Sequence, residues 1–274
     1  MEGGSVPEAA GQMSREMRLN KALARAGICS RRRADELVFS GRVKVNDGVV
    51  REPGIRVDPE KDSIIVDGRP VKIETEQERE LVHVMLNKPV QVVTTTSDPG
   101  GRAKVTDLLP DRLRRMRLFP VGRLDYFSQG LLILTNDGDL AHSLTHPSRK
   151  IPKIYRVKMR GDLSKKKLQI MRRGMVLSEG EKLAPVEVKI LQQTRDSVLA
   201  EMTLVQGINR QIRRMCRDLG LVVLSLVRIR QGPLALGDLK PGEWRYLEPG
   251  EVSQLRKWSS RTNHPQPLLN QGGG

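Results

Sequence analysis

The chain has 274 residues, with 48 Lys and Arg against 32 Asp and Glu, which gives a net charge of +16. This length predicts two domains, and the excess of cations favours a polyanionic partner such as nucleic acid. No apolar run reaches the roughly 18 residues of a transmembrane helix and the N-terminus lacks a signal-peptide core, so we expect a soluble, cytoplasmic protein without a membrane partner. Two widely separated cysteines, Cys29 and Cys216, favour a reducing compartment over a disulfide scaffold.

Residues 1–16 are rich in Gly, Glu, Ala and Pro without periodicity, and they are predicted to be a disordered lead. Apolar residues at helical spacing then predict a helix over residues 18–26 and a second over 31–40, with Ser30 as its N-cap. Valines on either side of Asn46-Asp47-Gly48 predict a β-hairpin over residues 43–50. These elements form the first predicted domain, residues 17–72.

Basic residues are concentrated in this first domain. Between residues 18 and 51 there are nine basic and three acidic residues, a net charge of +6. The triplet at 31–33 begins a helix, where positive charge is unfavourable unless an external anion binds there. We therefore predict RNA contacts from Arg18, Lys21, Arg25, Arg31, Arg32, Arg33, Arg42 and Lys44. The order of a helix, Ser30-Arg31-Arg32, a second helix and the segment Gly41 to Gly48 resembles the S4 RNA-binding domain.

The acidic stretch 73–80 is predicted to be a linker, and a second domain is predicted over residues 81–250. This domain opens with two expected strands, 81–86 and 91–96, around Asn87-Lys88-Pro89. Residues 119–138, FPVGRLDYFSQGLLILTNDG, predict a strand, an exposed corner, a second strand and a turn. The corner places the carboxylate of Asp125 beside the guanidinium of Arg123, and a charged loop held by strands is a common position for a functional site.

Further elements complete the second domain. We expect a short helix at 105–109, helices at 139–145, 163–175 and 209–219, and strands at 154–159, 186–191, 197–205 and 221–229. The strand at 154–159 presents Tyr155 and Val157 on one face, and the strand at 221–229 is expected to be buried. Residues 251–274 are predicted to be a short helix followed by a disordered tail.

The helix at 209–219 is amphipathic, with Asn209 as its expected cap. Arg213 lies at the edge of the apolar stripe, so its side chain is expected to be half-buried and to need a carboxylate. Asp125 is the predicted partner, held ionised by the pairing, although a structural pairing of Arg213 with another acid is the alternative. Three further arginines point away from the stripe and are predicted to contact RNA: Arg210, Arg214 and Arg217.

Several of these motifs also carry a family resemblance. GRLD, a hydroxyl residue three places on, and GLL-LTNDG resemble the catalytic signature of the RsuA/RluB/RluE/RluF family of RNA pseudouridine synthases. The resemblance implies an α+β fold, with an S4-like module followed by a catalytic domain built on a mixed, mainly antiparallel sheet. It also implies cofactor-free isomerisation of a uridine in ribosomal RNA, with 23S favoured over 16S, by a monomer that acts on free RNA or on a pre-ribosomal particle.

The same resemblance implies roles for individual residues. Asp125 would be the nucleophile or base, Arg213 of Gln211-Ile212-Arg213 its partner, and Tyr155 the ring beside the extruded base. Leu226 would line the pocket, Ser128 would keep the hydroxyl of a more usual Thr, and Arg123 would either fill the gap left by the flipped nucleotide or form a structural pair.

Other readings of the sequence remain open at this point. A non-catalytic RNA-binding or ribosome-assembly factor would need only the S4-like module and the charge. His142 and His146 have the i, i+4 spacing of metal ligands but no evident third ligand, so no metal is expected. Asp137 could pair with Asp125 as in a glycosidase, but Asn136-Asp137-Gly138 is better explained as a turn.

Overall fold

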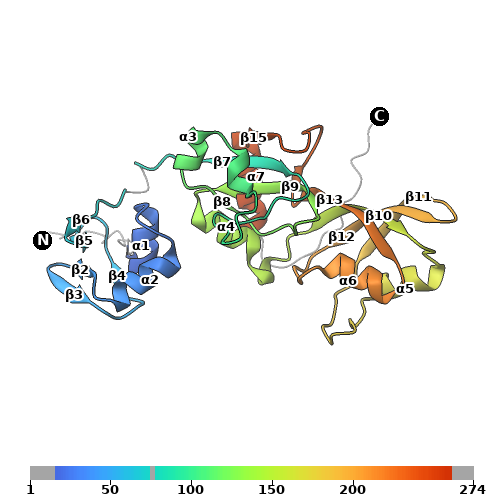
Figure 1. Ribbon diagram of the computed structural model, residues 1–274, viewed down its shortest axis with the longest axis horizontal. Helices are drawn as coiled ribbons and strands as arrows, with labels where there is room; N and C mark the ends of the chain where they lie inside the picture. Colours follow the sequence, from blue (N-terminus) through green and yellow to red (C-terminus); the bar gives the residue numbers. More distant parts are fainter. Residues whose placement is uncertain (1–15, 75–77, 261–274) are drawn as a thin grey trace, which may run out of the picture. The chain divides into compact units, whose positions relative to one another are not determined.

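The computed structural model describes residues 16–74 and 78–260, and the chain divides into two compact units, Met1–Glu80 and Leu81–Gly274 (Figure 1). Residues 1–15 of the predicted lead, 75–77 of the predicted linker and 261–274 of the predicted tail lie outside the described residues. In the described part of the chain, no helix has both the length and the apolar character needed to cross a membrane.

The first unit contains two helices packed on a small sheet. Buried residues of both helices, among them Leu23 and Leu37, pack against Val43 and Ile64 of the strands. The Ser30 hydroxyl caps the second helix by accepting a hydrogen bond from the Arg33 amide at 3.2 Å, as predicted. The elements are α1 (Leu19–Arg25), α2 (Arg31–Phe39) and a sheet in the order β3 (Gly48–Val50), β2 (Val43–Val45), β5 (Ile64–Val66) and β6 (Arg69–Pro70), with a separate pair β1 (Met17–Arg18) and β4 (Arg56–Val57).

The second unit is built on a nine-stranded sheet. Its main path runs β11 (Glu187–Gln193), β12 (Ser197–Leu204), β10 (Lys153–Arg160), β13 (Val222–Gln231), β9 (Gln129–Thr135), β7 (His83–Lys88) and β15 (Trp244–Tyr246). The short strands β8 (Phe119–Pro120) and β14 (Leu234–Ala235) pair with β9 and β13. The β13–β9 pairing is parallel and the other pairings are antiparallel, which confirms the expected mixed, mainly antiparallel sheet.

The two halves of this sheet are covered differently. Strands β7 and β9 are buried on both faces, because η1 (Val105–Leu108) and α3 (Asp111–Arg115) pack on one side, and α4 (Gly138–Thr145) and α7 (Pro249–Ser260) on the other. Strands β10, β12 and β13 are covered on one face by α5 (Lys165–Arg173) and α6 (Gln211–Asp218), which lie together on that side in Figure 1. One further short helix, η2 (Pro147–Arg149), follows α4.

Three local predictions are wrong. Residues 91–96 form only an isolated bridge at Val93, because the Thr94 and Thr95 hydroxyls bond to backbone groups and so compete with strand pairing. The cap of α6 is Arg210 in a left-handed conformation rather than Asn209. The 221–229 strand is only partly buried, since Val222 and Leu224 are each 50% exposed.

Candidate functional site

A cavity of about 400 Å³ opens in the second unit between the 122–128 loop, the β10 and β13 strands, and residues 204–212. This volume falls within the range of small-molecule sites. Among the residues predicted from the sequence, six line it: Arg123, Asp125, Ser128, Tyr155, Arg210 and Leu226. Asp125 is the only carboxylate among the lining residues, and its side chain is half-buried.

The loop that carries Asp125 is held by its backbone carbonyl groups. Each of the five consecutive carbonyl oxygens of residues 124–128 accepts one hydrogen bond. In chain order of the acceptors, the donors are Thr94 Oγ1 at 2.7 Å, Ser128 N at 2.9 Å, Gln91 N at 2.7 Å, Arg213 Nη2 at 2.7 Å and Lys88 Nζ at 2.8 Å. Two segments outside the loop, residues 88–94 and α6, therefore fix the position of Asp125 together with Ser128 of the loop itself, as preorganised sites require.

The predicted ion pair between Asp125 and Arg213 is not formed among the described residues. Arg213 is half-buried as expected, but its Nη2 atom donates to the Phe127 carbonyl, two residues from Asp125. Burial lowers the pKa of Arg213 and the nearby Arg210 lowers it further, whereas the charge of Asp125 acts in the opposite direction. Arg213 thus holds the loop by its backbone and interacts with Asp125 only through its charge.

Lys88 is a site residue that sequence reasoning treated only as part of a turn. Its side chain is 0% exposed, and Nζ donates to the carbonyl groups of Pro89 and Ser128 at 2.8 Å each. Burial lowers the pKa of Lys88 to about 8, while Asp125 raises it and Arg228 lowers it. The available signal is the position of Lys88 two residues after the largely apolar run 82–86, because a lysine that continues a buried strand needs a specific partner.

A β-bulge shapes the opposite wall of the cavity. Tyr155 pairs with Arg228 and Lys153 pairs with Gln231, with a register shift between the two pairs. The shift brings Arg228 and Gln231, three residues apart on β13, to the same cavity, together with Lys153 and Tyr155 of β10. Burial, followed by the charge of Arg228, lowers the pKa of Lys153 to about 8.

Several buried polar atoms around this cavity have no hydrogen-bond partner within the described residues. The side chains that carry them are at most 5% exposed, and they line the cavity. The atoms are Ser128 Oγ, Gln211 Oε1, Arg228 Nη2 and Gln231 Oε1. Buried polar groups are usually paired, so a cluster of unpaired ones around one cavity indicates a functional rather than a purely structural wall.

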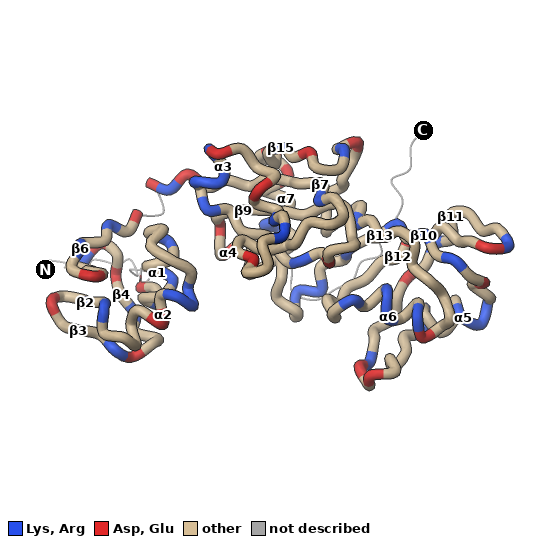
Figure 2. The backbone as a smooth tube through the Cα atoms, in the orientation of Figure 1, with Lys and Arg blue, Asp and Glu red and all other residues tan. Residues whose placement is uncertain are grey.

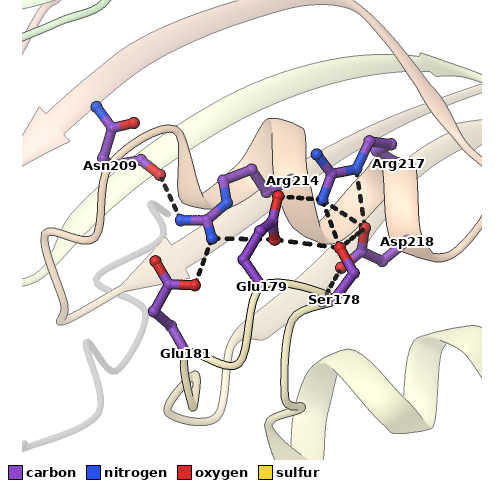
Figure 3. Close-up of polar contacts among 7 residues, drawn as sticks. All are labelled: Ser178, Glu179, Glu181, Asn209, Arg214, Arg217 and Asp218. Atoms are coloured by element: carbon purple, nitrogen blue, oxygen red, sulfur yellow. Dashed lines mark hydrogen bonds and ion pairs between the residues drawn. The ribbon is translucent and has the colours of Figure 1, made fainter.

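Arg214 and Arg217, which are predicted to contact RNA, are both paired with acids of the same chain. Figure 3 shows both guanidinium groups against an acidic loop: Arg214 binds Glu179 and Glu181, and Arg217 binds Glu179 at 2.6 Å. The two arginines hold the pKa of Glu179 down to about 2. The α6 face beyond Arg210 is therefore neutralised within the chain.

Some basic residues of the first unit are also paired with acids of the same chain, whereas others are not. Arg42 makes two hydrogen bonds of 2.6 Å to Asp67, which lies outside the basic stretch 18–51. Arg33 pairs with Glu36. Lys21 and Arg25 are partly buried. Among the residues that the structure describes, the predicted cations that are exposed and form no ion pair are Arg18, Arg31, Arg32 and Lys44.

The alternative sites have structural explanations. The Asp137 carboxylate caps α4 by accepting from the Asp139 and Leu140 amides, and it also pairs with Arg256. Asp137 does not line the cavity. The His142 and His146 rings lie 5.3 Å apart, and no cluster of three or more His, Cys, Asp or Glu residues suited to a metal ion occurs in the ranges 16–74 and 78–260.

Comparisons with family models and solved structures identify the two domains of the chain. A model described as RNA pseudouridylate synthase matches residues 82–218, and an S4 domain model matches residues 17–64. A solved structure described as a pseudouridylate synthase superposes with a TM-score of 0.63 at 27% identity, covering 87% of this chain and 99% of the other.

Relatives extend the similarity over most of the chain. An uncharacterized RNA pseudouridine synthase of Aquifex aeolicus is 42% identical over 88% of this chain and 94% of its own length. The ribosomal large subunit pseudouridine synthase B of Bacillus subtilis is 42% identical over 87% of this chain and 95% of its own. With an S4 domain before a catalytic domain of this fold, the chain belongs to the RsuA/RluB family of RNA pseudouridine synthases.

Proposed function

We propose that this protein isomerises one specific uridine of 23S ribosomal RNA to pseudouridine, with Asp125 as the catalytic residue. The observation that carries the proposal is that Asp125 is the one carboxylate among the residues lining the cavity, on a loop whose five carbonyl groups are all bonded. An aimed, fixed carboxylate has no use in an RNA binder, whereas it can act as a nucleophile or base on a bound nucleotide.

The chemistry requires the uridine to leave its stack and enter the cavity. The bond between uracil N1 and ribose C1′ breaks, C5 joins C1′, and the C5 proton is lost while N1 gains one, so atoms balance without a cofactor. Asp125 attacks the ribose, attacks the ring, or removes a proton in this sequence. Tyr155 and Leu226 supply the wall beside the base, and the exposed Arg123 side chain is long enough to occupy the vacated stack.

RNA affinity comes from cations outside the cavity. In the first unit, Arg18, Arg31, Arg32 and Lys44 are exposed, and contacts of this kind with phosphates make binding dependent on salt. The choice of 23S RNA rests on the similarity to the B. subtilis large-subunit enzyme. It also rests on residues 228–247, RIRQGPLALGDLKPGEWRYL, which resemble the RluB branch of the family. We propose that the protein acts as a monomer, in the cytoplasm where ribosomal RNA is made.

Pseudouridine mapping tests this assignment. Ribosomal RNA from a strain that lacks the protein is compared with RNA from the same strain carrying the wild-type gene or Asp125→Asn. We expect one pseudouridine in 23S RNA to be lost, restored by the wild-type protein and not by the variant. Loss of a 16S position instead would contradict the branch, and restoration by Asp125→Asn would contradict the catalytic role.

A further inference from the structure

The face of the nine-stranded sheet opposite to α5 and α6 carries a row of cations on a central strand, and these cations are exposed among the described residues. Because side chains alternate along a strand, Val157 and Met159 of β10 point into the core below α5 and α6, and both are 0% exposed. The intervening residues Arg156, Lys158 and Arg160 are exposed on the opposite face. Strands β12 and β13 flank β10 on both sides, so this row lies inside the sheet rather than at an edge. It spans roughly 13 Å.

Neither Lys158 nor Arg160 has a charged partner directly across the strands. Lys158 lies between Leu199 of β12 and Ser225 of β13. Arg160 has a similar position, with Ser197 and Val222 as its partners across the strands.

Only the first cation of the row has a carboxylate. Arg156 binds Glu201 at 2.9 Å, and within the described residues neither Lys158 nor Arg160 forms an ion pair. Opposite charges across strands stabilise a sheet and like charges side by side destabilise it. Lys158 and Arg160, which have no matching carboxylate among the described residues, are therefore better explained by an external anion than by folding.

The contrast with α6 strengthens this reading. There, Arg214 and Arg217 are bound by Glu179 and Glu181 of the same chain, as Figure 3 shows. The β10 row also lies on the sheet face opposite to the cavity, because Tyr155 lines the cavity and the alternating residues point away from it.

Lys and Arg occur throughout both units in Figure 2, so the first unit alone does not account for the basic character of the chain.

We propose that the β10 row, defined as Arg156, Lys158 and Arg160, uses its two unpaired cations, Lys158 and Arg160, to bind the phosphate backbone of a second RNA segment, distinct from the segment whose uridine enters the cavity. This inference rests on the proposed function for the identity of the RNA. Its consequence is that a folded ribosomal RNA, which can reach both faces of the sheet at once, binds more tightly than a short stem-loop with the same uridine.

The test uses Lys158→Gln/Arg160→Gln in the full-length protein. The matched control is Lys240→Gln/Lys257→Gln, which removes the same charge from exposed positions elsewhere in the second unit. Filter binding is measured over a range of salt concentrations with transcribed full-length 23S RNA and with a short stem-loop around the modified uridine. Circular dichroism melting checks that both variants fold.

We expect the Lys158/Arg160 variant to lose on the order of tenfold in affinity for 23S RNA, with the slope of log K against log salt reduced by about 2. Stem-loop binding and turnover should remain at the level of the control. Equal affinity and slope for the two double variants on 23S RNA would overturn the proposal, and an equal loss on the stem-loop would show that the row contacts the target segment instead. Binding is read without turnover, so a failure of the catalytic assignment is seen separately.

Discussion

Replacing Arg213 with Gln removes the hydrogen bond that its Nη2 atom donates to the Phe127 carbonyl at 2.7 Å. A hydrogen bond from a charged donor contributes about 1.5–3 kcal/mol, and the lower value applies because the side chain is only half-buried. A loss of about 1.5 kcal/mol lowers the equilibrium constant between the held and the displaced loop by roughly tenfold. We therefore expect kcat to fall about tenfold with KM for RNA nearly unchanged, since Arg213 does not line the cavity.

Two further variants separate the possible roles of Arg213. Arg213→Lys keeps a positive charge near Asp125 but loses the planar fork that reaches the carbonyl, so it should remain slow. Arg214→Gln, on the same helix, removes ion pairs to Glu179 and Glu181 without touching the loop and should retain its kcat. Single-turnover tritium release from 5-tritiated uridine in RNA measures each rate. Wild-type turnover by Arg213→Lys would refute the loop-holding role and favour a purely electrostatic one.

Three further predictions follow from the same loop and sheet. Thr94→Val removes the bond to the Leu124 carbonyl and should lower kcat about fivefold in the tritium assay, while an unchanged rate would contradict its role. Gly130→Ala should lower the melting temperature by several degrees, corresponding to about 3 kcal/mol, because φ is +115° and a Cβ would overlap the backbone of Arg228. Lys88 has a pKa of about 8 in the folded chain and 10.5 in the unfolded chain, so the unfolded chain binds more protons between these pH values. The free energy of unfolding should therefore rise with pH by about 1.4 kcal/mol per pH unit in this range. Lys88→Met should lack that rise in denaturant titrations, and equal slopes of unfolding free energy against pH for the two proteins would show that the pKa of Lys88 is not perturbed.

Periodicity predicted the elements better than it predicted the contacts between them. The apolar stripe of α6 correctly indicated that Arg213 is half-buried, because the stripe depends only on residues within the helix. It could not indicate which atom the guanidinium meets. That depends on the path of the 124–128 loop, where the Phe127 carbonyl rather than the Asp125 carboxylate comes within reach.

Long-range pairing is a second feature that the sequence pattern does not show. Arg214 and Arg217 are predicted to contact RNA because they point away from the apolar stripe of α6. Their partners Glu181 and Glu179 are 33 and 38 residues away in the sequence, on a loop that the fold brings against α6. Opposite charges at such separations leave no local pattern, so only the coordinates show that this face is neutral.

Lys88 illustrates a third limit. A lysine before proline was interpreted as part of a turn, and β7 does end there. What the pattern does not show is that helices cover β7 on both faces, which buries the side chain against the 124–128 loop. By contrast, Asp125, Tyr155 and Leu226 come from distant segments and line one cavity as the resemblance implied.

The central claim, that the Asp125 carboxylate performs the isomerisation, is tested most directly by comparing wild-type protein and Asp125→Asn in single-turnover tritium release, with RNA binding measured in parallel. Asparagine has nearly the same size and leaves the loop's carbonyl bonds in place, so affinity should change little. The account predicts no tritium release above background from the variant. Release at the wild-type rate by a variant that binds RNA normally would contradict it.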